Sequence, residues 1–254
     1  MEEEKLAAYE ELKAENMEIK YVLNKLTHEM GNALTILGAS MYNIERSIQN
    51  ENINVNLNDL KNDYIYICSL FKELREYNST DDIVKREITV EEIVKDIEDL
   101  AYKLQNNTDI KFNIFRQENT LTRKVYGDII KLRQVFVNII KNSVEAVEEN
   151  ETEKGKNIFI GINGENSNKQ ILDDKDASKK CEMIHIEVVD NGKGILKDNL
   201  DKIFESMYTY GKKDGTGLGL AIVKKIIDNH NGKIKAVSVL GTGTALHIYL
   251  PIIK

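Results

Sequence analysis

The 254-residue sequence contains no tryptophan and only one proline, Pro251. Because proline interrupts helices, a chain almost without it can form long, unbroken ones. Its only two cysteines, Cys68 and Cys181, lie far apart, outside any Cys-x-x-Cys pair or Cys/His ligand spacing. A disulfide framework or a zinc site is therefore not expected, and the cysteine content fits a reducing compartment.

The sequence also lacks long apolar runs. No stretch of about 18 apolar residues is present, as a membrane-spanning helix would require. The N-terminal segment MEEEKLAAYEEL is acidic, unlike a signal peptide. The formal net charge of −7 disfavours nucleic acid as a partner. We therefore expect a cytoplasmic protein with no membrane span and no nucleic-acid partner.

Residues 1–80 carry the pattern of an antiparallel helical hairpin. Two series of apolar residues at helical spacing are separated by an Asn-rich segment, NENINVNLN. A lone hairpin of two such helices buries little surface. Pairing with a second copy would complete a four-helix bundle, so a homodimer is expected; the alternative is a hairpin packed only on its own C-terminal domain. The first series, with steps of three and four, is Leu23, Leu26, Met30, Leu34, Leu37, Met41, Ile44 and Ile48, and the second is Leu57, Leu60, Tyr64, Ile67, Phe71 and Leu74.

His28 lies opposite this apolar seam. With Leu23 and Met30 at heptad position a, His28 falls at position f and should face water. An exposed histidine on a helix is usually an ordinary surface residue. Glu29 could, however, hold the proton of one ring nitrogen and leave the other as a nucleophile. Position alone leaves both interpretations open.

Residues 83–254 show an α+β pattern. We expect a mixed sheet covered by helices on one side, forming an α/β sandwich domain. The polar segment 163–182 is expected to be a surface insertion. Thr89 and Glu92 fit a capping box at the start of the first helix. The expected helices are 89–104, 128–149 and 218–230, and the expected strands are 111–117, 157–162, 184–190, 232–239 and 243–251.

The first two of four motifs in this domain are an asparagine pair and an Asp-Gly turn. Asn138 and Asn142, at i and i+4 of one helix, share a face, and amide oxygens can ligate a Mg²⁺ that holds nucleotide phosphates. DNGKG (190–194) follows an apolar strand. Its carboxylate could accept from an exocyclic amine such as that of adenine, and its glycines permit close approach of a ligand. A solvated polar stripe and an ordinary turn are the alternatives.

The other two motifs are rich in glycine. GTGLGL (215–220) opens a helix whose N-terminal amides and dipole favour a phosphate chain. GTGT (241–244) enters the last strand and alone could be a hairpin turn. No motif is decisive singly, but the four in this order and spacing are specific.

These motifs resemble the ATP-binding domain of histidine kinases, within the superfamily of gyrase, Hsp90 and MutL ATPases. VFVNIIKNSVEA is similar to the N box, and FESMYTYGKK (204–213) is similar to the lid segment. The resemblance implies that Asn142, assisted by Asn138, binds Mg²⁺ and that Asp190 recognises adenine. It also implies ATP-binding or pocket-shaping roles for Gly192, Gly194, Gly215, Thr216, Gly217, Leu218, Gly219 and Thr244, with Lys141 and Lys212 as phosphate contacts.

HEMGNAL (28–34) resembles the phospho-acceptor box His-Glu-x-Arg-Asn-Pro-Leu of the same kinases, with Gly31 and Ala33 departing from it. The resemblance implies that His28 is phosphorylated from ATP, with Glu29 as base or orienting acceptor. The phosphoryl group would then pass to an aspartate of a response-regulator receiver domain. Glu29 and Asn32 also fit the pattern of kinases that dephosphorylate their partner. With 27 residues before His28, we expect a sensor-less orphan kinase or the catalytic core of a larger one.

Two alternatives remain open. In the first, the hairpin relays phosphate and the ATP domain has lost its function, which the complete glycine and asparagine motifs disfavour. In the second, the chain is an ATP-hydrolysing machine of the gyrase or Hsp90 type. Such proteins need a carboxylate just before the N-box asparagine, and residues 137–141 contain no acid.

Overall fold

The computed structural model describes residues 2–49, 64, 65, 67, 83–150, 155–166, 182–209 and 217–253. The chain divides into two compact units, residues 1–77 and 78–254. Among the described residues, no helix combines the length and the apolar character needed to cross a membrane.

The first unit contains one long helix, α1 (Glu2–Gln49). Two of its described side chains, Val22 and Ala33, are buried, whereas Leu23, Leu34 and Met41 of the predicted seam are 49%, 56% and 53% exposed. The single chain therefore buries only part of the predicted apolar seam. Of the second predicted helix, only residues 64, 65 and 67 are described, and they are helical. The hairpin itself stays a prediction.

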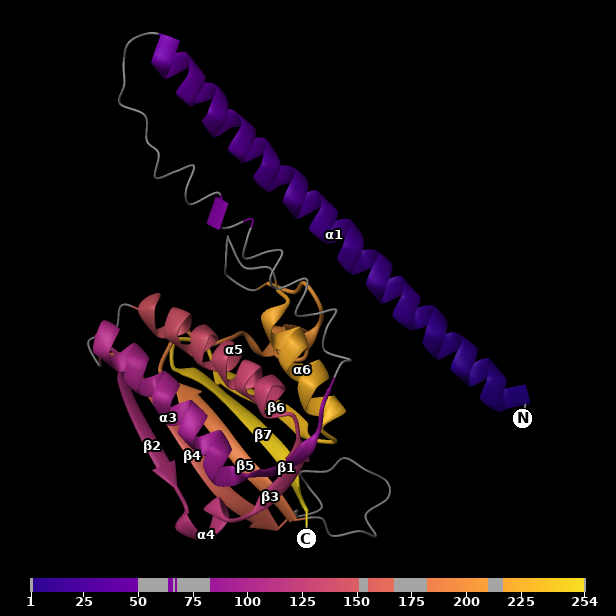
Figure 1. Ribbon diagram of the computed structural model, residues 1–254, viewed down its shortest axis with the longest axis vertical. Coiled ribbons are helices and arrows are strands. Elements are labelled where there is room, and N and C mark those ends of the chain that lie inside the picture. The colour runs from indigo at the N-terminus through magenta and orange to yellow at the C-terminus, as the bar shows by residue number, and fades with distance from the viewer. Residues whose placement is uncertain are drawn as a thin grey trace. The chain divides into compact units, whose positions relative to one another are not determined.

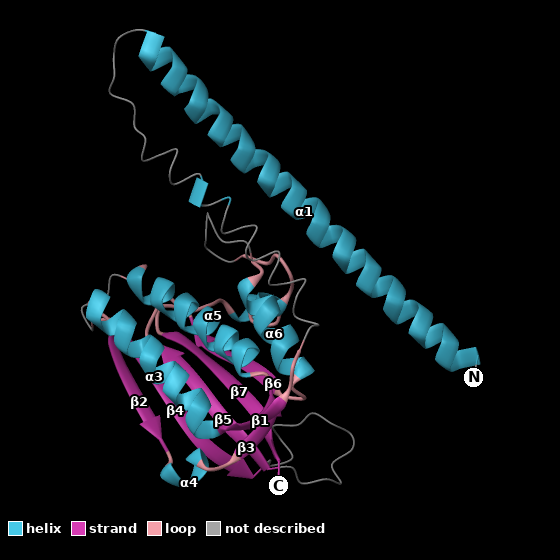
Figure 2. Ribbon diagram, viewed as in Figure 1, coloured by secondary structure: helices cyan, strands magenta, loops and turns pink. Residues whose placement is uncertain are grey.

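The described residues of the second unit form a seven-stranded sheet (Figure 2). It is mixed, as predicted, although only five of its strands were expected. The strand order is β1-β3-β7-β5-β4-β2, and β6 also pairs with β7. The β2–β4 pair is parallel and the other pairs are antiparallel. The strands are β1 (Arg86–Thr89), β2 (Lys111–Arg116), β3 (Lys124–Gly127), β4 (Asn157–Asn166), β5 (Glu182–Asp190), β6 (Lys233–Val239) and β7 (Gly243–Ile253).

Three helices, α3 (Val90–Asn107), α5 (Ile129–Glu148) and α6 (Gly219–Asn229), lie against one face of this sheet (Figure 1). A short helix, α4 (Glu118–Leu121), precedes β3, and two 3₁₀ turns span Lys197–Asn199 and Lys202–Phe204. The core between helices and sheet is largely isoleucine, and each fully buried side chain of this size contributes about 1.5–3 kcal/mol. It includes Ile93, Ile97, Ile139, Ile140, Ile158, Ile160, Ile184, Ile186, Ile222, Ile226 and Ile248.

Side-chain caps fix where two of these helices begin. Thr89 and Glu92 form the predicted capping box of α3. A hydrogen bond from the Arg86 guanidinium lowers the pKa of Glu92 to about 2. At α5, the Asp128 carboxylate accepts from the backbone N–H groups of Ile130 and Lys131 at 2.9 and 3.2 Å. Both helices therefore start at residues that the local sequence specifies.

The structure differs from the sequence-based expectation in its short elements, which include the unpredicted helix α4, and in the bounds of the insertion. Strands β1 and β3 were not predicted, because four residues are too few to show a clear alternation; they pair with each other, Ile88 opposite Val125. The predicted insertion 163–182 was too long, since residues 163–166 belong to β4 and Glu182 to β5. The polar side chains of these residues gave no strand pattern, although the backbone pairing of β4 and β5 continues to Asn166 and Glu182. Residues 167–181 lie outside the described part.

Candidate functional site

Asp190 stands at the end of the central strand β5 and is only 6% exposed. Its Oδ1 accepts hydrogen bonds from the backbone N–H groups of Gly192 at 2.9 Å and Thr244 at 3.2 Å. The Ser143 side chain of α5 adds a third hydrogen bond. Burial raises the pKa of Asp190, although all three bonds act in the opposite direction. The carboxylate is thus held in place by its own loop, by β7 and by α5.

Glycines allow the backbone to close around this carboxylate. A Cβ on Gly192 would lie 2.6 Å from the carbonyl carbon of Ala146 in α5, and a Cβ on Gly243 would lie 1.9 Å from the carbonyl oxygen of Asp190. Gly194 has φ +69°, and its Cβ would lie 2.2 Å from Val239 O. Side chains at these positions would push the loop away from its neighbours. The DNGKG and GTGT motifs therefore form one packed structure around Asp190.

Thr244 enters this structure through both its backbone and its side chain. Its N–H donates to Asp190, and its hydroxyl lies 3.0 Å from the Ser238 hydroxyl of β6. Ser238 also donates to the Gly243 carbonyl and accepts from the Ile195 N–H, both at 2.8 Å. Ser238 and Ser143 were not predicted as site residues, because a serine within a strand or helix gives no signal until its neighbours in space are known.

Asn138, the first of the asparagine pair, connects α5 to the start of α6. The amide nitrogen of Asn138 donates to the carbonyl oxygen of Gly219 at 3.3 Å. Asn142 is half-buried one turn further along α5, next to Ser143. From Asn138 to Ala146 the axis of α5 rises about 12 Å. One side of α5 thus links the glycine-rich start of α6 to the Asp190 loop, which brings together all four sequence motifs.

The loop before α6 is fixed by an unusual backbone contact. Gly217 has φ +70°, and its Cβ would lie 2.5 Å from the carbonyl carbon of Met207. Met207 has φ +65°, which L-residues rarely adopt, and its N–H donates to Gly217 O at 2.9 Å. Leu218 is buried at the start of α6. Of the predicted ATP contacts in this region, Lys212, Gly215 and Thr216 lie outside the described residues.

Lys141, another predicted phosphate contact, points to solvent. Its side chain is exposed, and Nζ lies 3.9 Å from the Glu145 carboxylate one turn later. Lys141 therefore lies on an exposed side of α5, and its role as a phosphate contact stays a prediction.

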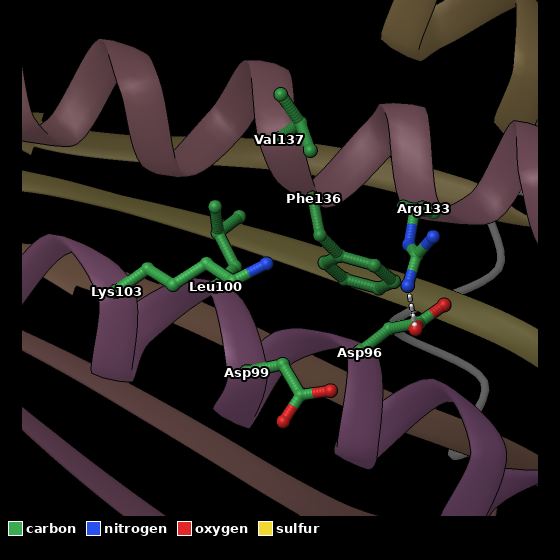
Figure 3. A pocket seen from close by; sticks show the side chains of 7 residues that line it. All are labelled: Asp96, Asp99, Leu100, Lys103, Arg133, Phe136 and Val137. Carbon is green, nitrogen blue, oxygen red and sulfur yellow. Dashed lines mark hydrogen bonds and ion pairs between the residues drawn. The ribbon is translucent and has the colours of Figure 1, made fainter.

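A pocket of about 260 Å³ lies between α3 and α5 (Figure 3). The Arg133 guanidinium of α5 pairs there with the Asp96 carboxylate of α3. None of the four motifs contributes a lining residue, so this pocket is separate from the Asp190 site. Its lining is Asp96, Asp99, Leu100, Lys103, Arg133, Phe136 and Val137.

The predicted phospho-acceptor residues lie on α1. His28 is exposed, as its heptad position predicted, and Glu29 is half-buried. The Nδ1 atom of His28 lies 3.3 Å from the Asn32 amide nitrogen. As placed, the Asn32 amide nitrogen is the donor, so Nδ1 of His28 accepts this hydrogen bond. Asn32 therefore contacts the His28 ring, and the role of Glu29 as base or orienting acceptor stays a prediction.

Together, the one-sided α/β sandwich and the anchored carboxylate between glycine-rich turns define a nucleotide-binding domain. Residues 127–254, about half of the chain, match the model of the histidine kinase-, DNA gyrase B- and HSP90-like ATPase family, and the chain belongs to this family.

A curated relative extends the similarity to the N-terminal unit. Sporulation kinase E of Bacillus subtilis is 30% identical over 230 residues, which are 89% of this chain and 28% of the relative. The sensory histidine kinase/phosphatase NtrB of Rhodobacter capsulatus is 36% identical over 126 residues, 50% of this chain and 33% of that protein. The chain thus spans about a quarter to a third of these relatives' lengths.

Among solved structures, the histidine kinase ThkA in complex with the response regulator protein TrrA is similar with a TM-score of 0.61. The identity is 23%, and the match covers 89% of this chain and 60% of that one. At this identity the similarity supports the fold.

Proposed function

We propose that the chain is a histidine protein kinase that phosphorylates its own His28 from ATP. The phosphoryl group then passes to an aspartate of a response-regulator receiver domain. The observation that carries the proposal is that one chain combines an anchored, glycine-enclosed carboxylate, Asp190, with an exposed histidine on a separate helical unit. The kinase names of the relatives and the regulator bound to ThkA point the same way.

In this proposal the Asp190 site holds the adenine end of ATP. A buried carboxylate fixed by three hydrogen bonds is a strong acceptor for an exocyclic amine. The glycine positions supply the fit, because a Cβ at Gly192 or Gly243 would occupy space that the enclosing backbone now fills. The phosphates would extend along α5 toward Gly217 and Gly219, where helix α6 offers its N-terminal amides.

The asparagine pair provides oxygen ligands for Mg²⁺. Asn138 uses its amide nitrogen on Gly219 O, so its amide oxygen is not engaged in that bond. Hard oxygen ligands are those that Mg²⁺ prefers. Bound beside Asn138 and Asn142, the ion would neutralise charge on the phosphates.

His28 supplies the nucleophile. The lone pair of one ring nitrogen attacks the γ-phosphorus, the bond to the bridging oxygen of the β-phosphate breaks, and ADP leaves. Glu29 acts on the other ring nitrogen as base or orienting acceptor. Transfer to a receiver aspartate then regenerates the free imidazole. We place this chemistry in the cytoplasm, on a homodimer of the helical unit.

A second activity, dephosphorylation of the partner, is supported by the contact between Asn32 and His28. An amide one turn from the histidine could orient a water molecule toward a phospho-aspartate. The name of the relative NtrB, a sensory histidine kinase/phosphatase, combines the same two activities. Asn32→Ala should slow loss of label from a phosphorylated receiver while His28 can still be labelled.

Incubation with γ-labelled ATP tests the kinase proposal. The wild type should gain an acid-labile, base-stable phosphoryl group, and His28→Gln should gain none while binding ATP as tightly. Asn43→Ala, a change at another exposed position of α1, should label like the wild type. Undiminished labelling of His28→Gln would exclude His28 as the acceptor, and no labelling of the wild type would favour a relay protein.

A further inference from the structure

The sheet face opposite the three helices carries a cluster that the proposed kinase chemistry does not use. His185 and Glu187 are two residues apart on β5 and so project from the same face. His247 of β7 is paired directly with Glu187 in the antiparallel register. The alternate residues, Ile184 and Ile186, are buried toward the helices. Strand pairing therefore brings two imidazoles and a carboxylate together.

The potential ligand atoms have separations typical of a metal site. His185 Nε2 lies 3.1 Å from His247 Nδ1, and His247 Nδ1 lies 3.6 Å from Glu187 Oε2. One such atom from each of the three residues lies within 4.8 Å of the other two. In tetrahedral zinc sites with bonds of about 2.0–2.2 Å, ligand atoms are about 3.3–3.6 Å apart. Small side-chain rotations would therefore complete the geometry.

Surrounding residues hold the cluster in position. The His185 ring is 7% exposed and stacks on Tyr249, with centroids 4.6 Å apart and planes 9° apart, and on His247 at 5.3 Å. On β4, a Cβ at Gly161 would lie 2.7 Å from Glu187 Oε1, so glycine leaves room for this carboxylate. Ligands fixed before binding lose less conformational entropy when the metal arrives.

We propose that His185, Glu187 and His247 bind one Zn²⁺ ion, with the fourth position open to water. Two histidines and one glutamate form a known zinc ligand set, and imidazole ligands favour zinc over magnesium. Lys235 of β6 pairs with His247 and adds a nearby positive charge, which limits the affinity. The ion would cross-link β5 and β7, the strands that carry Asp190 and Thr244. No zinc site was expected from the sequence, because the spacing of cysteines and of Cys/His ligands does not reveal a set made of two histidines and a glutamate.

The test uses the 254-residue chain without a histidine tag and with Cys68→Ser and Cys181→Ser, so that no thiolate can bind zinc. After metal removal by a chelator, Zn²⁺ is titrated in excess Mg²⁺ by calorimetry. We expect one Zn²⁺ per chain and a melting temperature that rises with the Zn²⁺ concentration. His247→Gln and Glu187→Gln should each lower the Zn²⁺ affinity at least about tenfold.

His28→Gln is the matched control, because it removes the exposed histidine of α1 and should leave Zn²⁺ binding unchanged. Circular dichroism of the metal-free variants checks folding, and if one variant fails to fold, the other decides. The proposal is overturned if the parent chain shows no saturable Zn²⁺ binding. It is equally overturned if a folded His247→Gln or Glu187→Gln variant binds Zn²⁺ like its parent.

Discussion

At the scale of single residues, His230 shows how one buried imidazole joins separate elements. Its Nδ1–H donates to Ile226 O at 2.7 Å, and its Nε2 accepts from the Asp128 N–H at 2.9 Å. These partners define a neutral ring in one tautomer. Burial lowers the pKa of His230, and the nearby Lys85 charge lowers it further. A Cβ on Gly127 would lie 2.6 Å from the ring, so the neighbouring glycine is part of the same packing.

The His230 pKa predicts how stability depends on pH. The pKa of His230 in the folded protein lies below the ordinary 6.5. The contribution of the neutral ring to the free energy of unfolding is therefore fully present above pH 6.5 and is lost as the pH falls through the lowered pKa. A protonated ring would leave the Asp128 N–H without its acceptor, and a buried donor without a partner costs about 1–3 kcal/mol of stability. Urea unfolding from about pH 7.5 to about pH 5 should show a steeper loss for the wild type than for His230→Gln. Parallel curves would contradict this assignment.

A substitution of Asp190 should weaken ATP binding without unfolding the protein. In Asp190→Asn the new amide oxygen could still accept from Gly192 and Thr244, but the variant loses the charge that strengthens a bond to adenine. ATP affinity should fall by about 1.5–3 kcal/mol, the contribution of a charged hydrogen bond, while the fold persists. Asp96→Asn, which removes a carboxylate in the α3–α5 pocket, should bind ATP like the wild type. Calorimetry compares the two variants, and equal affinities would remove Asp190 from the site.

At the scale of elements, the approach of the Asp190 loop to α5 depends on Gly192. A Cβ there would lie 2.6–2.7 Å from three atoms of Ala146, two of them backbone. Gly192→Ala should therefore displace the loop and sharply weaken ATP binding. Gly38→Ala is the matched control, since a Cβ at this exposed position of α1, in the other unit, meets no described atom within 4 Å. It should preserve ATP affinity and stabilise the helix slightly. Fluorescent nucleotide titration checks both variants, and equal affinities would contradict the predicted close packing.

The elements also show how far the sequence could predict this structure. The sequence could predict the long strands, the three large helices and the Asp190 motif. Their signals, the periodic spacing of apolar residues and the spacing of glycines, lie within short segments of the chain. Strands β1 and β3 and the end of β4 were not, because long-range backbone pairing defines them. The same holds for Ser143 and Ser238, and for the His185–Glu187–His247 cluster, whose members meet only when β5 and β7 pair.

At the scale of the whole molecule, α1 exposes a long apolar stripe within the single chain. Its members are spaced by four, seven or eleven residues, so they lie on one side of a slowly coiling helix. Large exposed apolar surfaces of this kind mark interfaces. The stripe consists of Leu12, Ile19, Leu23, Leu34 and Met41, all between 44% and 57% exposed. We infer that a second copy covers it.

This inference predicts that a charge on the stripe separates the dimer. Leu34 is 56% exposed in the single chain, so glutamate there should leave α1 folded. In a twofold symmetric dimer, however, the interface would bury two such carboxylates, one from each copy, at a large cost in free energy. Light scattering at micromolar concentration should give twice 29.0 kDa for the wild type and 29.0 kDa for Leu34→Glu. Asn43→Glu adds the same charge at an exposed polar position of α1 and should remain dimeric. ATP affinity should be equal in all three proteins, because the nucleotide site lies in the other unit. A monomeric wild type would refute the bundle, and a dimeric Leu34→Glu would move the interface to another side of α1.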